Sequence, residues 1–321
     1  MAVRAISDVR KFALSHHLEG LTGACLRHIR AGDAGYTLDR ARHYLDFQAR
    51  IARELLNHRV ITNNPYTAWF RRGGQDVEQV RALTVQFSVF SNQFLVAQLR
   101  KVINADSLEG MRASKEILAN EIGVVFNAGA LHRPQQAEVG DAVDPELVST
   151  RGTVEGGIFH FRAAHFEWLM QVADALGLEF GAVGQRRHGT AATLHFCDEL
   201  ARLYGSEDYR ISQAASYAVE NWASAGFWDE LIEGLRRFNR RTGAGLPLAF
   251  FAWHARLEAQ HARHTQEELE SLYFTGEVDE AGFIRDGNEM LDAVAVFWEG
   301  LDEQRRRLAM ASGGPESTRV T

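Results

Sequence analysis

Apolar residues recur at helical spacing along almost the whole chain, and this periodicity limits the possible folds more than any other feature. It predicts helices near residues 5–30, 37–60, 75–103, 107–126, 159–177, 190–204, 208–239, 247–272 and 280–310. Only 5 of the 321 residues are Pro, so few positions interrupt these helices. Strand signals are short and weak. We therefore expect an all-α helical bundle.

Two stretches break the helical pattern and divide the chain. Residues 61–74, "ITNNPYTAWFRRGG", are expected to be a loop because they contain Asn-Asn-Pro and Gly-Gly, which are typical of turns and loops. Residues 128–157 form the longest loop-like segment, and a loop of that length in a compact domain is more often functional than idle. We expect residues 1–75 to form an N-terminal helical extension packed on a bundle of residues 76–310. Residues 311–321 are expected to be a disordered tail.

Composition excludes several classes of protein. The formal net charge is −7 and there is no basic block, which argues against a nucleic-acid partner. The two cysteines are far apart, so neither a disulfide framework nor a cysteine metal site is expected, and a reducing cytoplasm suits the chain. The first twenty residues lack an apolar core long enough for a signal peptide, so none is expected, and no apolar run is long enough to span a membrane. Phosphate-loop, dinucleotide-binding and serine-hydrolase motifs are also missing from the sequence.

The stretch "FFAWHARLEAQHARH", residues 250–264, carries the strongest chemical signal. His254, Glu258 and His261 are spaced at steps of four and three, so a helix places all three on one face. Imidazole and carboxylate groups together suit iron, manganese or zinc. A solvated helix face would also explain this pattern. However, the preceding "LPLAFFAW" predicts that the helix starts in apolar surroundings, where polar groups need partners. His264 lies off the stripe.

Three more helices each carry one isolated polar residue in an apolar or aromatic context. These residues are Glu121 in "ILANEIGVVF", His165 in "FHFRAAHFEWLM" and Glu220 in "ASYAVENWASAGFW". Each alone is compatible with an ordinary core residue that has found a partner. Together with the stretch at 250–264 they supply imidazole or carboxylate groups from four helices. A helical bundle assembles a dinuclear carboxylate site in its core in this way.

This arrangement resembles the heme-oxygenase-like diiron oxidases and oxygenases, which bind two irons in place of heme. In that family a Glu on the first core helix, a His on the second and a Glu on a later helix precede an H-x3-[DE]-x2-H motif. Glu121, His165, Glu220 and the His254–Glu258–His261 motif match these positions, and the order agrees from about residue 92 to 272. The resemblance implies a heme-oxygenase-like seven-helix bundle. One departure is Glu258, which stands where the N-oxygenase used for comparison has Asp.

At the position of a seventh candidate ligand, the sequence resembles the N-oxygenating members of the family, such as the central domain of the streptozotocin-pathway enzyme. These members have an additional Glu ten residues before the second-helix His, and Glu155 holds that position here. Alkene-forming members instead have a Glu three residues before that His, where this chain has Arg162. The resemblance therefore implies seven metal ligands: Glu121, Glu155, His165, Glu220, His254, Glu258 and His261.

The resemblance implies a non-heme diiron enzyme that uses two Fe (Fe2+/Fe3+), O2 as co-substrate and an external reductant. The expected reaction is oxygenation of an amine, guanidine or amino-azole nitrogen of a small molecule, by N-hydroxylation or by oxidation of an amine to a nitro group. The other expected partners are an electron donor and a second copy, in a homodimer formed through the N-terminal extension. Desaturation or C–C cleavage of an amino or fatty acid, a mixed Mn/Fe site and a non-enzymatic helical protein stay open as alternatives.

Overall fold

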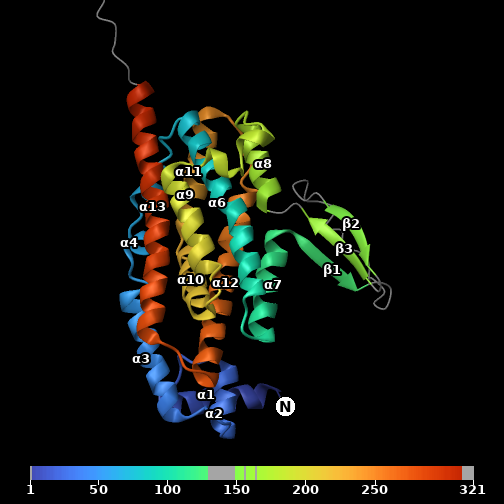
Figure 1. Cartoon of the computed structure of the whole chain (residues 1–321), viewed down its shortest axis with the longest axis vertical. Helices are drawn as coiled ribbons and strands as arrows, with labels where there is room; N and C mark the ends of the chain where they lie inside the picture. The colour runs from blue at the N-terminus through green and yellow to red at the C-terminus, as the bar shows by residue number, and fades with distance from the viewer. Residues whose placement is uncertain (1, 129–148, 155–156, 163–164, 313–321) are drawn as a thin grey trace, which may run out of the picture.

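The computed structural model describes residues 2–128, 149–154, 157–162 and 165–312, which form a long helical bundle with a small sheet beside it (Figure 1). The first helices are α1 (Ala2–His16), α2 (Gly23–Ala31), α3 (Leu38–Glu54), α4 (Arg59–Thr62), α5 (Pro65–Phe70), α6 (Val77–Ile103) and α7 (Leu108–Glu121). After the sheet follow α8 (His165–Ala175), two single 3-10 turns, α9 (Ala191–Glu199), the π-helical segment η3 (Leu200–Tyr204), α10 (Tyr209–Ala223), α11 (Phe227–Thr242), α12 (Ala249–Thr275) and α13 (Glu280–Ser312). Among these described residues no helix is both long and apolar enough to cross a membrane.

The bundle is built around α6, α10, α12 and α13. Helix α10 packs against both α12 and α13, and α6 packs against α7, α8, α9 and α13. Aromatic rings join these helices: the ring centroid of Phe87 on α6 lies 5.4 Å from that of Trp228 on α11 and 5.8 Å from that of Phe250 on α12. Large aromatic side chains contribute much of the buried apolar area of a core. The predicted all-α bundle is therefore present.

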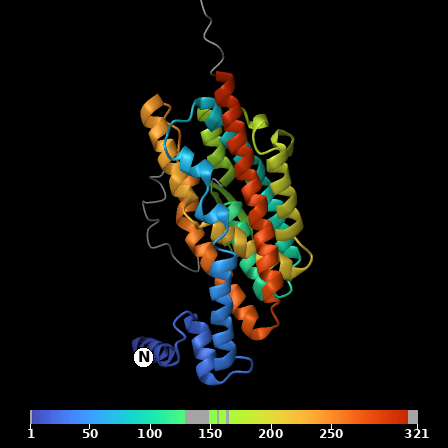
Figure 2. The ribbon, with the colours of Figure 1, turned by 90° about the vertical axis from the view of Figure 1, so that its left-hand side faces the viewer.

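The N-terminal helices lie at one end of the bundle, where α1 and α2 project from it (Figures 1 and 2). Helix α3 runs along α12 and α13 and α5 packs against α11, so this part of the chain shares the bundle's core. Specific hydrogen bonds hold it there. The Thr22 backbone N–H donates to the Glu270 carboxylate at 3.1 Å, and Arg40 Nε donates to the Tyr273 carbonyl at 2.9 Å.

Three of the predicted boundaries were wrong in detail. The predicted helix 5–30 is interrupted between α1 and α2, where His17 adopts a positive φ of 57°. The predicted loop 61–74 contains α5, which Asn64 caps through bonds to two backbone N–H groups and which starts with Pro65. Proline is favoured at the first helical position because its missing N–H has no intrahelical partner there. The predicted helix 208–239 breaks at Gly226, whose φ of 93° favours glycine.

A three-stranded antiparallel sheet was not predicted. It consists of β1 (Val124–Ala128), β2 (Ser149–Val154) and β3 (Gly157–Arg162) in the order β1-β3-β2, with Val124 paired to Phe161 and Ser149 to Arg162. The sheet replaces the end of the predicted helix 107–126 and the start of the predicted helix 159–177. Gly123, with a φ of 70°, ends α7. The β-branched and aromatic residues that follow it in β1, and those of β3, favour strands. Residues 129–148 and 155–156 of the loop-like region, residues 163–164, and residues 313–321 of the expected tail lie outside the described residues.

Candidate metal centre

His254 is held in one orientation inside the bundle. Its side chain is 7% exposed, and its ring stacks on Trp228 with centroids 4.4 Å apart and planes 21° apart. Nδ1 lies 2.6 Å from the carbonyl oxygen of Phe250, one turn earlier on α12. A carbonyl can only accept, so Nδ1 carries the proton and the lone pair of the neutral ring is on Nε2. Metal-binding histidines commonly have this arrangement, in which the second ring nitrogen fixes the tautomer.

Glu220 is the most buried of the predicted ligands whose side chains are described. It lies on α10 and is 3% exposed, in a helix whose other buried residues are mostly small or aromatic. Its Oε1 lies 3.4 Å from the hydroxyl of Tyr204, the last residue of η3. A buried carboxylate is costly unless charged or hydrogen-bonding partners surround it. Glu220 therefore belongs to a polar group of residues inside the bundle.

Glu121, Glu220 and His254 line one small cavity, although 99 residues of sequence separate the first two and all three come from different helices. The cavity has a volume of about 60 Å³. Its other walls are Phe87, Phe90, Ser91 and Phe94 of α6 and Val219, Trp222, Ala223 and Trp228. That volume suits ions and small molecules such as water or O2 and is too small for an organic substrate. The mixture of two carboxylates and an imidazole fits iron or manganese.

The other four predicted ligands cannot be placed as side chains. Glu155 lies outside the described residues, as do the side chains of His165, Glu258 and His261. The backbone positions are informative for three of them. His165 is the first residue of α8, which packs against both α6 and α12. Glu258 and His261 continue α12 at helical spacing from His254.

Among the side chains that are described, no three His, Cys, Asp or Glu residues form a group that could hold a metal by themselves. Glu121, Glu220 and His254 thus share a cavity without completing a site within the described part of the chain. The seven-ligand site stays a prediction. Glu121 lines the cavity, whereas Glu116, five residues earlier on the same helix, is exposed and does not line it.

A second group of polar residues, most of them buried, adjoins Glu220 and was not predicted from the sequence. Its members are Gln98 and Lys101 of α6, Tyr204 of η3, Ser216 of α10 and Glu268 of α12, and we call it the Lys101 cluster. Two signals point to it. Ser216 is one turn before Glu220, and Glu268 extends the stripe of His254, Glu258 and His261 by two further turns. The partner of these residues, Lys101, has no such signal because it lies on a helix distant in sequence.

Burial raises the pKa of Tyr204 well above its ordinary value, and the negative charge of Glu220 adds to this effect. The phenol therefore stays protonated and acts as a hydrogen-bond donor. Burial likewise raises the pKa of the Cys197 thiol to about 11. A buried thiol with such a pKa is a poor nucleophile, so Cys197 is not a catalytic candidate.

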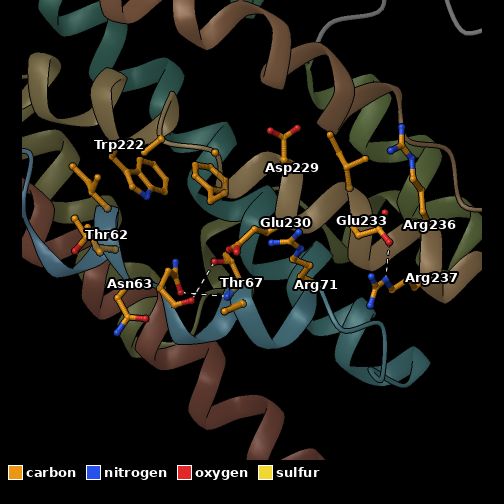
Figure 3. Close-up of a pocket in the computed structure, with 18 residues that line it drawn as sticks. Thr62, Asn63, Thr67, Arg71, Trp222, Asp229, Glu230, Glu233, Arg236 and Arg237 are labelled. Atoms are coloured by element: carbon orange, nitrogen blue, oxygen red, sulfur yellow. Dashed lines mark hydrogen bonds and ion pairs between the residues drawn. The ribbon is translucent and has the colours of Figure 1, made fainter.

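A larger groove lies on the outer surface between α4, α5 and α11 (Figure 3). It has a volume of about 790 Å³ and a mixed lining of cations and anions. Arg71 and Glu230 project into it from its two walls, and Arg237 Nε donates to Glu233 Oε1 at 2.6 Å. Trp222 lines both this groove and the small cavity. Its indole is therefore part of the partition between them.

Comparison with known proteins supports the fold. No family model matches the sequence, and no curated protein matches it. Among solved structures, the chain is similar to a CADD-like protein of unknown function from Nostoc punctiforme PCC 73102, with a TM-score of 0.51 and 17% identity. The match covers 84% of this chain and 99% of that one. The chain therefore shares the fold of that CADD-like protein, which agrees with the helical bundle that the sequence predicted.

Proposed function

We propose that this protein is a non-heme diiron oxygenase that uses O2 and an external reductant to oxidise a nitrogen of a small molecule. One observation carries the proposal: Glu121, Glu220 and His254 come from three helices and line one small cavity. Two carboxylates and an imidazole around one small cavity are the kinds of group that bind iron or manganese. The spacing of Glu258 and His261 along α12 supplies two more ligand groups on the same helix face.

In this proposal Glu121, Glu220 and His254 hold the metals together with Glu155, His165, Glu258 and His261. The irons, when bound, supply the electrons and the open coordination positions needed to activate O2. The chain's own contribution is to bind and enclose. The Phe250 carbonyl orients His254, and Trp228 covers the face of its ring. Three phenylalanines of α6 give the cavity an apolar wall, and a low-dielectric wall strengthens electrostatic interactions beside it.

The preference for nitrogen rests on Glu155 and on Arg162, through the resemblance to N-oxygenating members. The substrate proposed is an amine, guanidine or amino-azole. It has to approach from outside the 60 Å³ cavity, because the cavity has no room for it. Desaturation or C–C cleavage is the competing reaction on the same site.

Metal binding is tested first. The purified protein is loaded anaerobically with Fe(II), desalted and assayed for iron, beside His254→Ala and the matched control His195→Ala. His195 is an exposed histidine on α9, so its removal changes the histidine count without touching the cavity. We expect about two irons per chain for the wild type and the control and a clear loss for His254→Ala. Well under one iron per wild-type chain would refute the diiron proposal.

The reaction type is tested with candidate amines under 18O2, followed by mass spectrometry. N-oxygenation adds labelled oxygen to nitrogen. A product that has lost two hydrogens or a carbon fragment would instead support desaturation or C–C cleavage, and would contradict the role given to Glu155.

A further inference from the structure

Helix α7 presents one narrow stripe of residues to the bundle. Among the described residues of α7, those that are buried are Gly110, Ser114 and Ile117. Glu121, which lines the small cavity, is the next residue at the same spacing, so all four lie on one face of the helix. Successive residues of an α-helix are rotated by about 100° around its axis. The rotation of α7 therefore decides whether the Glu121 carboxylate reaches the cavity.

Gln98 of α6 bonds to α7 in the middle of this stripe. Its side chain is completely buried, and its Nε2 donates to the carbonyl oxygen of Ser114 at 2.7 Å. A carbonyl can only accept, so the nitrogen end of the amide has to face α7, and the oxygen end accepts from the Tyr204 hydroxyl of η3. The Ser114 carbonyl belongs to the backbone of α7. The bond from Gln98 therefore restrains the helix as a whole and not one flexible side chain.

A second contact lies on the same face, one turn nearer the start of α7. A Cβ at Gly110 would overlap the hydroxyl oxygen of Tyr209, so a larger residue cannot pack here without a shift. That hydroxyl donates to Glu268 Oε1 on α12, which restrains the phenol ring. Gly110 precedes Ser114 by four residues and Glu121 follows Ser114 by seven, so both contacts act on the face that carries Glu121.

We propose that Gln98 is a positioning residue for Glu121: its bond to the Ser114 carbonyl fixes the rotation of α7 that places the Glu121 carboxylate at the cavity. The inference rests on the proposed metal-binding role of Glu121 and extends that role to a residue that contributes no ligand. Gln98 acts on the helix that carries Glu121. Loss of the groups that orient metal ligands typically weakens metal binding about 10–100-fold.

The test compares Gln98→Leu with the matched control Gln86→Leu. Gln86 is also a buried glutamine of α6 whose amide is used at both ends. Its Nε2 donates to the His188 carbonyl at 2.9 Å, and its Oε1 accepts from the Thr193 hydroxyl at 2.7 Å. It therefore holds the turn before α9 and the start of α9, which contain no predicted ligand. Circular dichroism checks that each variant is folded.

The first measurement is amide hydrogen exchange of the metal-free proteins, read by mass spectrometry. Because the bond to the Ser114 carbonyl is lost, we expect Gln98→Leu to exchange faster than the wild type across residues 108–121. In Gln86→Leu the same residues should exchange as in the wild type. Wild-type exchange across α7 in Gln98→Leu would overturn the inference.

The second measurement is a Co(II) titration followed by visible absorption, because the spectrum of Co(II) reports its coordination. We expect Gln98→Leu to bind Co(II) more weakly by about 10-fold or more, with an altered spectrum, and Gln86→Leu to match the wild type. In a Glu121→Gln background, Gln98→Leu should cause little further loss, because its effect passes through Glu121. Full additivity in that background, or equal weakening in Gln86→Leu, would overturn the inference.

If Gln98→Leu does not fold, Gly110→Ala takes its place, since the added Cβ displaces the same face of α7 from Tyr209. The expected and overturning results are then the same. A wild type that binds no Co(II) would instead overturn the proposed function, and hydrogen exchange would still decide whether Gln98 fixes α7. The two failures are therefore distinguishable.

Discussion

The Lys101–Glu268 pair gives the most quantitative prediction for stability. Replacing Lys101 by Met keeps the length of the side chain but removes an ion pair of 3.7 Å and a hydrogen bond of 2.7 Å to Ser216. At this separation the attraction is about 4 kcal/mol for an effective dielectric constant of about 20. When Lys101 is replaced, the Glu268 side chain, which is 16% exposed, keeps some hydration and the hydrogen bond from the Tyr209 hydroxyl. We therefore expect Lys101→Met to lower the free energy of unfolding by about 3 kcal/mol, at the low end of the range for breaking a buried pair.

The assay is urea unfolding of metal-free wild type, Lys101→Met, Glu268→Gln and the double variant, with a chelator present so that metal binding does not contribute. Each single variant leaves one charge of the pair without its opposite charge, whereas the double variant removes both charges. The double variant should thus lose about 2 kcal/mol less than the two single losses added together. Additive losses, or a change in Lys101→Met below about 0.5 kcal/mol, would show that the pair has no energetic role.

Three further predictions concern other parts of the chain. Gly300→Ala should lower the free energy of unfolding by about 1–3 kcal/mol, because a Cβ there would lie 2.3 Å from the Cβ of Ala192 and force α13 away from α9; unchanged thermal unfolding would contradict this close approach. Burial raises the pKa of Cys25 to about 12 and that of Cys197 to about 11, so at pH 8 intact mass spectrometry should find neither thiol alkylated by iodoacetamide until urea unfolds the protein. Burial also raises the pKa of the Glu270 carboxyl above its ordinary 4.5, so the folded state binds the carboxyl proton more tightly than the unfolded state does. The free energy of unfolding therefore falls as the pH rises from 4.5 through the pKa of Glu270 in the folded protein. Glu270→Gln should flatten that slope in thermal unfolding measured across the same pH range, and identical slopes in the two proteins would refute the assignment.

The sequence located much of the candidate site because its strongest signals are local. Spacing along one helix places His254, Glu258 and His261 on one face before any tertiary contact forms. Glu121 and Glu220 stood out because each is a carboxylate in an apolar stretch, and both prove to line the cavity with His254. What failed was the region between α7 and α8. The predicted helices 107–126 and 159–177 were too long at the ends that face each other in the sequence. Those ends contain glycine and β-branched residues and form strands of the sheet.

The sequence by itself determined the helical class of the protein and the polar stripe on α12, since both depend on residues within a few turns of one another. The tertiary structure alone decided which helices face each other. Lys101 and Ser216 are 115 residues apart, and no pattern in the sequence around Lys101 predicts their contact. Only the packing of η3 against both α6 and α10 brings the Lys101 ammonium to the Ser216 hydroxyl and the Tyr204 ring. Side-chain periodicity fixes the face of each helix, whereas the pairing of faces depends on how apolar surfaces from the whole chain bury one another.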